Sequence, residues 1–233
     1  MKAARTESAG TRLRVALRVA CALASLMTAP RQAAAQDRPR AAKPLRVFAG
    51  AEPAAGGAFE FTLDGFSYHV GAGGNGRREK AGSLTRRFNL RLEGRTQVAG
   101  RVYFAEYEGD LLLAYEVADG ARAAGRLTRL RQPSMRAAWN AELPRGGVGP
   151  PAREGRFLYA TAAGFAGKLD LATGAFAWSH EDLRPRGGGG AFDSFDAPEV
   201  EGEEVLFRGR PVYNGRAPAV YVDKRSGRIT RVE

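Results

Sequence analysis

Alternating apolar and polar positions along much of the chain predict short β-strands. Residues Phe59–Leu63 and Phe66–Val70 alternate with a period of two, and Asp64-Gly65 between them is typical of a two-residue hairpin turn. Further short apolar runs occur at 88–92, 101–105, 111–115, 156–160, 167–169, 204–207 and 219–222. Because Gly-containing turns separate many of these runs, the pattern predicts an all-β fold.

One glycine-rich segment, Gly71–Gly76, matches the G-x-G-x-x-G pattern directly after a predicted strand. A dinucleotide site would need a helix to open at the last glycine, so that its free amides meet the pyrophosphate. The residues that follow, 77–83, carry no apolar stripe from which such a helix could form. We therefore expect Gly71–Gly76 to be a mobile loop.

A short phrase occurs three times, as Glu116–Gly120, Asp170–Gly174 and Asp223–Gly227. Its leading acids lie 54 and 53 residues apart, a period typical of repeated β architectures. An acid near the start of a tight turn accepts from backbone amides, and a closing glycine adopts positive φ without strain. We interpret the phrases as three copies of a structural turn, carried by Glu116, Gly120, Asp170, Thr173, Gly174, Asp223, Ser226 and Gly227.

The segment Asp170–Trp178 reads D-x-x-T-G-x-x-x-W and resembles the PQQ-like β-propeller repeat, with a likeness that covers about residues 95–233. In that family the tryptophan packs between neighbouring blades, so the resemblance implies a packing role for Trp178. Trp139 fits the same role if Ala121–Ala138 is an insertion. The third phrase has Arg231 at the tryptophan position.

The number of repeats bears on the architecture, because propellers close with four or more blades and three phrases are present. We expect repeated antiparallel four-stranded units in a small or incomplete β-propeller-like array, with a β-sandwich as the alternative. In this division residues 45–94 are an N-terminal β segment or a degenerate blade, and residues 95–233 are the PQQ-like repeat region.

The N-terminus predicts export. Residues 1–35 combine a basic leader, an apolar stretch and Ala33-Ala34-Ala35 before a cleavage point, as a signal peptide does. Residues 36–44 are then a flexible lead-in to a periplasmic or secreted protein with no transmembrane segment. The one cysteine, Cys21, lies in the leader, so the mature chain has no disulfide or thiolate site.

Charge suggests one class of ligand. Residues 1–35 hold six Lys or Arg and one Glu, so their removal lowers the net charge from +11 to +6. A moderately basic chain is compatible with an anionic glycan or another polyanion, although we do not expect a nucleic acid. Candidate anion-binding residues are Arg122, Arg126, Arg129, Arg131, Arg136, Arg208, Arg210 and Arg216.

No catalytic, cofactor or metal site is predicted. The PQQ-like family includes quinoprotein dehydrogenases, but the mature chain lacks the adjacent cysteines of many of them and is too short for their eight blades. Its two histidines, His69 and His180, are too few for a multi-histidine metal centre. Our first hypothesis is a noncatalytic binding or scaffold protein for a protein or peptide partner in the cell envelope. The second is an anionic glycan binder, and the third is an enzyme with an unrecognised site.

Overall fold

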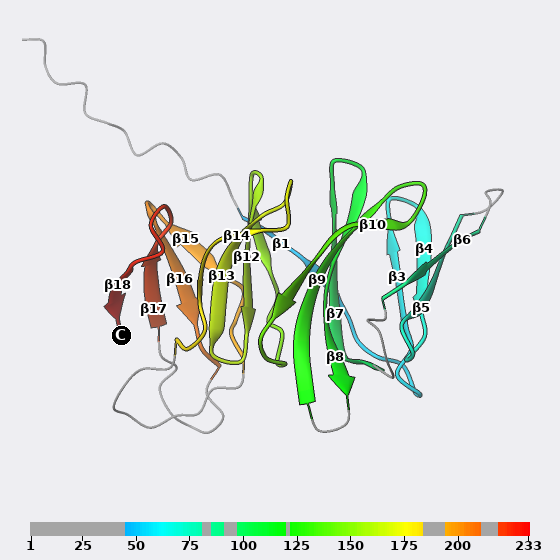
Figure 1. Cartoon of the computed structure of the whole chain (residues 1–233), viewed down its shortest axis with the longest axis horizontal. Coiled ribbons are helices and arrows are strands. Elements are labelled where there is room, and N and C mark those ends of the chain that lie inside the picture. The colour runs from blue at the N-terminus through cyan, green and yellow to red at the C-terminus, as the bar shows by residue number, and fades with distance from the viewer. Residues whose placement is uncertain (1–44, 81–84, 91–96, 120–121, 184–193, 211–218) are drawn as a thin grey trace, which may run out of the picture. The chain divides into compact units, whose positions relative to one another are not determined.

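A computed structural model describes residues 45–80, 85–90, 97–119, 122–183, 194–210 and 219–233 (Figure 1). These residues form eighteen β-strands, and no helix occurs among them. Accordingly, the described part of the chain offers no helix that could span a membrane. The predicted leader and lead-in, residues 1–44, lie outside the described residues.

Sixteen of the strands form four antiparallel sheets in which each strand pairs with the next along the chain. The N-terminal sheet contains β3 (Phe59–Leu63), β4 (Phe66–Val70), β5 (Asn75–Glu79) and β6 (Arg86–Asn89). The second sheet contains β7 (Gln97–Tyr107), β8 (Asp110–Asp119), β9 (Arg122–Arg131) and β10 (Arg136–Leu143). The third sheet contains β11 (Ala152–Glu154), β12 (Phe157–Ala162), β13 (Phe165–Asp170) and β14 (Phe176–His180). The C-terminal sheet contains β15 (Glu199–Glu201), β16 (Glu204–Arg208), β17 (Ala219–Asp223) and β18 (Ile229–Val232).

Two short strands from the start of the described chain join the edges of the middle sheets. Strand β1 (Arg46–Val47) pairs with β11, and β2 (Ala49–Ala51) pairs with β7. Phe48, between them, is buried in the core and donates its amide to Pro151 O at 3.0 Å. This segment therefore ties the second and third sheets together.

The four sheets follow one another along the array (Figure 1), and three layers of the core lie between successive sheets. A smaller buried cluster of Leu206, Ala219 and Tyr221 belongs to the C-terminal sheet. Phe61 of the N-terminal sheet stacks on Phe104 of the second, with ring centroids 4.1 Å apart. In β12, Leu158 packs into the layer shared with the second sheet, and Tyr159 packs into the layer shared with the C-terminal sheet. Middle strands are thus buried on both faces, whereas β3 alternates because only one of its faces is covered.

These observations confirm the predicted fold class. The described chain is all-β and consists of repeated antiparallel sheets packed in sequence order, as in a propeller-like array, and not of the two sheets of a sandwich. A four-stranded sheet occupies residues 59–89, within the predicted N-terminal β segment.

Two segments differ from the prediction. The expected mobile loop after Gly71 is wrong from Asn75 onward, because Asn75–Glu79 forms β5. Its inward positions are Gly76 and Arg78, which give no apolar signal, although the Arg78 side chain is only 6% exposed. The expected insertion Ala121–Ala138 is also wrong, since it contains β9 and the start of β10.

The first repeated phrase lies at a different corner from the other two. Glu116 is inside β8, where it pairs with Gly125, and its carboxylate accepts from the amide of Gly147. The phrases at Asp170 and Asp223, in contrast, lie between the third and fourth strands of their sheets. Glu116 is therefore not the start of an equivalent turn, and Gly120 lies outside the described residues.

The equivalent turn of the second sheet is Arg131–Met135. Its Met135 amide donates to Arg131 O at 2.7 Å, as Gly174 donates to Asp170 O at 2.8 Å and Gly227 to Asp223 O at 2.9 Å. Met135 also has a positive φ of 58°, beside 75° at Gly174 and 74° at Gly227. The residue before each closing residue is Ser134, Thr173 or Ser226. Its hydroxyl oxygen accepts a hydrogen bond from the backbone amide two positions on. The structural repeat thus begins at Arg131, Asp170 and Asp223.

This register accounts for Trp139 without an insertion. Trp139 follows Met135 by four residues, as Trp178 follows Gly174 and Arg231 follows Gly227. The leading residues of the three turns are 39 and 53 residues apart, so the uniform spacing of the original phrases was partly coincidental.

Candidate functional site

The two tryptophans join neighbouring sheets. Trp139 Nε1 donates to Leu171 O at 2.9 Å, and Trp178 Nε1 donates to Lys224 O at 3.1 Å. A Cβ at Gly174 would lie 2.6 Å from Trp139, and a Cβ at Gly227 would lie 2.6 Å from Trp178. Each indole therefore packs on the glycine of the next sheet's turn, which is the inter-blade position that the resemblance implies for Trp178.

A cation lies across from each tryptophan and binds the same carbonyl. Arg129 pairs in register with Trp139, and its Nη1 donates to Leu171 O at 3.0 Å. Lys168 pairs with Trp178, and its Nζ donates to Lys224 O at 2.8 Å. Burial lowers the pKa of Lys168. The same two positions in the C-terminal sheet hold Tyr221 and Arg231, with the guanidinium 3.5 Å from the ring centroid.

Charged groups surround these contacts, and one ion pair among them, Glu154–Lys224, joins two sheets. Arg129 Nε lies 2.6 Å from Asp110 Oδ2, and the other carboxylate oxygen of Asp110 accepts from Gln132 N at 3.1 Å. At the next interface Glu154 accepts from Tyr159 at 3.0 Å and pairs with Lys224 at 3.3 Å. Burial, with a smaller contribution from Glu154, raises the pKa of Tyr159. These polar groups serve the packing of the array.

The predicted turn residues satisfy backbone amides. Asp170 Oδ1 accepts from Ala172 N at 2.9 Å, and Asp223 Oδ1 accepts from Ser226 N at 2.7 Å and from Ser226 Oγ at 2.6 Å. The hydrogen bonds from Ser226 lower the pKa of Asp223. Both acids therefore have partners within their own turns, and neither faces a ligand cavity found in the described chain.

The structure does not bring the predicted arginine set together. Five of its members belong to the second sheet and two, Arg208 and Arg210, lie in or next to the C-terminal sheet, whereas Arg216 lies outside the described residues. Arg126 pairs with Glu142 at 3.1 Å, Arg129 is held at the interface described above, and Arg210 pairs with Asp196 at 2.7 Å. The exposed members are Arg122, Arg131, Arg136, Arg208 and Arg210.

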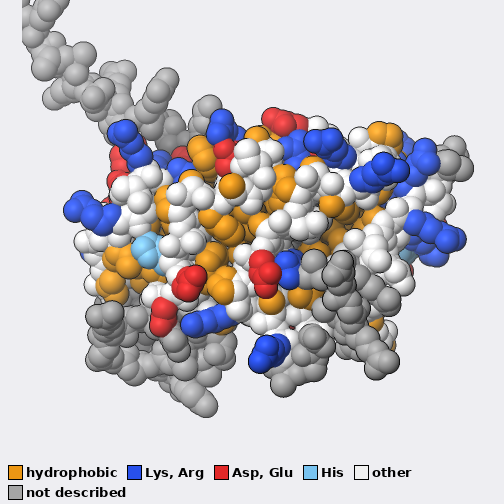
Figure 2. Space-filling view, in the orientation of Figure 1, with side chains coloured by type: hydrophobic (Ala, Val, Ile, Leu, Met, Phe, Trp, Pro, Cys, Tyr) orange, Lys and Arg blue, Asp and Glu red, His pale blue; other side chains and the backbone are white. Residues whose placement is uncertain are grey.

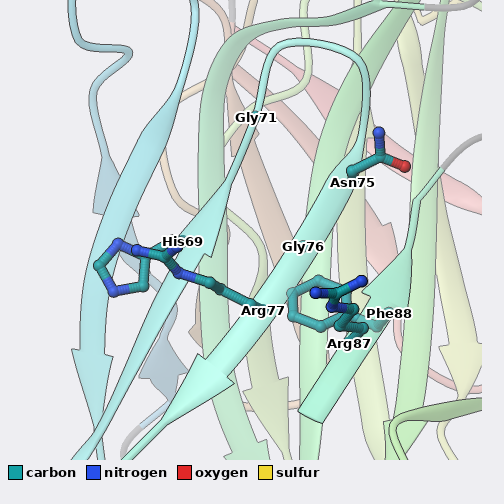
Figure 3. Close-up of a pocket in the computed structure, with 7 residues that line it drawn as sticks. All are labelled: His69, Gly71, Asn75, Gly76, Arg77, Arg87 and Phe88. Carbon is teal, nitrogen blue, oxygen red and sulfur yellow. The ribbon is translucent and has the colours of Figure 1, made fainter. Parts of the chain in front are cut away.

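A different set of side chains surrounds a hollow of about 580 Å³ on the N-terminal sheet (Figure 3). It is lined by His69, Gly71, Asn75, Gly76, Arg77, Arg87 and Phe88. His69, Arg77 and Arg87 lie side by side in register across β4, β5 and β6, and Glu60 of β3 continues the row. We call this solvent-facing surface of β3–β6 the open face; Figure 2 shows Lys and Arg side chains gathered at this end of the described chain.

The ion pairs of the open face involve His69 and Arg77 but not Arg87. His69 Nδ1 lies 2.9 Å from Glu60 Oε1, and its Nε2 lies 3.6 Å from Glu79 Oε2. Arg77 Nε lies 3.1 Å from Glu79 Oε1. Arg87 is exposed, and it forms no ion pair with a residue of the described chain. It stands directly opposite Arg77, an arrangement that places two like charges in one cross-strand pair.

Sequence reasoning missed this site, although a signal was present. The doublets Arg77-Arg78 and Arg86-Arg87 both follow the segment that was interpreted as a loop. Once residues 75–79 are assigned to a strand, alternation places Arg77 outside and Arg78 inside, which agrees with their exposure in the structure.

Comparison with known proteins supports no closer identification. No protein-family model and no curated protein matches the chain. Among solved structures, it is similar to the quinohemoprotein alcohol dehydrogenase ADHIIG from Pseudomonas putida HK5, with 14% identity and a TM-score of 0.47 over 81% of this chain and 36% of that one. The quinohemoprotein alcohol dehydrogenase from Comamonas testosteroni has 13% identity and a TM-score of 0.40 over 81% of this chain and 23% of that one. Apo AztD from Citrobacter koseri has 9% identity and a TM-score of 0.32 over 74% of this chain and 70% of that one.

The chain thus spans about a third or less of the two dehydrogenases, and these likenesses do not extend to activity, substrate or partner. The PQQ-like resemblance holds here at the level of a propeller-like fold; membership of that repeat family stays a prediction.

Proposed function

We propose that this chain is a noncatalytic binding protein, exported by its N-terminal leader, that holds a protein or peptide partner on the open face of the N-terminal sheet. The observation that carries the proposal is the hollow over β4–β6, where Arg87 has no ion pair among the described residues. At the sheet interfaces, by contrast, the charged groups pair with one another or with backbone carbonyls. Within the described part of the chain, the open face combines unused hydrogen-bonding capacity with room for a ligand.

The two imidazoles support a binding role over acid–base chemistry. His180 Nε2 lies 2.6 Å from Gly227 O, at the interface of the third and C-terminal sheets. His69 is held between Glu60 and Glu79, and both of its ring nitrogens face carboxylates. Each histidine therefore has a local structural partner.

Photo-crosslinking in the native cell tests the proposal. A photoreactive amino acid at Ser67 or Asn75 reports on the open face, since both side chains are exposed there; Ser179 of β14 is an exposed control on the third sheet. We expect a discrete crosslinked protein or peptide from positions 67 and 75 and none from 179. Equal crosslinking at all three positions, or none at the open face, would refute the proposal.

A second candidate is the binding of an anionic glycan by exposed arginines. Arg131 and Arg136 favour it, because they are exposed and lie opposite each other in register. Such binding would weaken steeply with salt and would be lost in an Arg131→Gln/Arg136→Gln variant. Retention of a sulfated glycan by that variant at unchanged salt dependence would remove this candidate.

A further inference from the structure

We propose that the segment held on the open face is acidic, and that Arg77 and Arg87 bind its carboxylates across β5 and β6. This inference rests on the proposed function and names the chemistry of the partner. It depends on three features of the N-terminal sheet: the pairing of its arginines, the unequal use of their guanidinium groups, and the placement of its acids.

The arginine pairing of β5 and β6 is unfavourable without an anion. Arg77 lies opposite Arg87, and Arg78 lies opposite Arg86, so two like-charge pairs follow each other in a single pair of strands. Directly opposite like charges destabilise a sheet. Arg78 is compensated from within, because it donates to the Gln132 side chain and stacks 4.1 Å from the Phe66 ring centroid. Arg87 has no such compensation among the described residues.

The guanidinium groups that border the hollow are free to bind a carboxylate. Arg77 uses Nε toward Glu79, and its two Nη groups form no ion pair with a described residue. Arg87 forms no ion pair with a described residue, so its Nε and both Nη groups can all bind a ligand. Planar guanidinium groups match carboxylates in two-point hydrogen bonds. An anion between the two arginines would therefore turn a repulsive pair into an attractive site. At about 580 Å³, the hollow is large enough for more than one side chain of an extended segment.

The acids of the open face determine where such a segment can lie. Glu60 is on β3, and Glu79 is shared between His69 and Arg77. Their carboxylates repel an acidic ligand from β3 and from the Glu79 end of β5, whereas β6 contributes only Arg86 and Arg87 as charged residues. Figure 3 shows Asn75 and Arg87 on two strands that border the hollow. The acidic segment is thus directed along β6 and the Asn75–Arg77 part of β5.

Peptide binding by the full chain tests the inference. The probe is a fluorescent Glu-rich peptide, and its matched control has the same length with Gln in place of Glu. We expect the Glu peptide alone to bind, with an affinity that falls as salt increases. Arg87→Gln and Arg77→Gln should each weaken binding about tenfold or more, since each removes a hydrogen-bonded charge pair. Arg225→Gln, an exposed arginine in the turn of the C-terminal sheet, is the matched control and should bind as the natural chain does.

A melting measurement separates binding from folding. Because Arg87→Gln removes a like-charge contact, the free variant should melt at the same temperature as the natural chain or higher, even though it has lost affinity. A clear fall in melting temperature would instead indicate a structural role for Arg87 and would overturn the inference.

Three further outcomes decide the partner class. No binding of the Glu peptide, or binding insensitive to Arg77→Gln and Arg87→Gln, refutes the inference. Equally tight, arginine-dependent binding of a sulfated glycan or RNA shows a general polyanion site and refutes the acidic segment as its specific partner. If crosslinks at positions 67 and 75 persist while the Glu peptide fails to bind, the proposed function stands and this inference fails.

Discussion

At the residue scale, Gly227 meets two separate requirements. Its φ of 74° is strained for any residue with a Cβ, and an added Cβ would lie 2.6 Å from Trp178. Gly202, in the same sheet, has a φ of 60° but nothing within 4 Å of an added Cβ. The two glycines thus separate the cost of backbone strain from the cost of steric contact.

We predict that Gly227→Ala destabilises the protein more than Gly202→Ala. The control should lose about 1 kcal/mol of unfolding free energy from backbone strain. Gly227→Ala should lose about 1–3 kcal/mol more, because the methyl group displaces the Trp178 ring. Urea denaturation of both variants measures the difference. Equal losses would mean that the Trp178 contact tolerates a methyl group.

The contribution of Asp223 to the stability of the fold depends on pH. Hydrogen bonds from Ser226 lower its folded pKa, so the folded state favours the carboxylate and this contribution is present above the unfolded pKa, near 3.8. It is lost as the pH falls through the lower folded value. We predict that Asp223→Asn is less stable than the natural chain at pH 7 and that the difference shrinks below pH of about 4. Thermal melts from pH 7 to pH 3 measure it; a difference independent of pH would contradict the assignment.

At the element scale, the alternation of apolar and polar residues predicted those strands whose inward positions are apolar. It predicted β3 and β4 with the bounds that the structure shows. It failed for β5, because that strand places Gly76 and a buried, hydrogen-bonded Arg78 inward. The turn at Arg131–Met135 was equally hidden, since Arg131 replaces the acid and Met135 replaces the glycine, and only backbone geometry reveals the equivalence.

The ion pair between Arg129 of β9 and Asp110 of β8 should contribute strongly to stability. Their side chains are 14% and 12% exposed, and Arg129 also binds Leu171 O of the third sheet. Arg129→Leu should cost about 3–5 kcal/mol of unfolding free energy, because the buried Asp110 carboxylate loses its partner. Arg131→Leu, an exposed neighbour on β9, should change stability little. Denaturant unfolding compares them, and similar losses in the two variants would contradict a special role for Arg129.

At the scale of the whole described array, the candidate site and the packing contacts use different parts of the molecule. Tryptophan, cation and turn join the second, third and C-terminal sheets by one repeated arrangement. Sequence could indicate that arrangement through Trp178 and Gly174, which have distinctive residue types. It could not indicate the open face, because that site depends on the cross-strand register of arginines that are unremarkable as surface residues.

Burial on two faces predicts an order of opening across the array. Strand β12 is buried along nearly its whole length because sheets cover both of its faces, whereas β18 is exposed at every position and β6 at three of four. Amides of β12 and β13 should therefore exchange only through global unfolding, and those of β6 should exchange through local opening at much lower free energy. Hydrogen exchange, resolved by analysing fragments of the protein, measures this order.

The Glu-rich ligand peptide should selectively slow exchange in β5 and β6, because binding there stabilises the closed strand pair. Slowing confined to β9 and β10 would instead locate binding at Arg131 and Arg136.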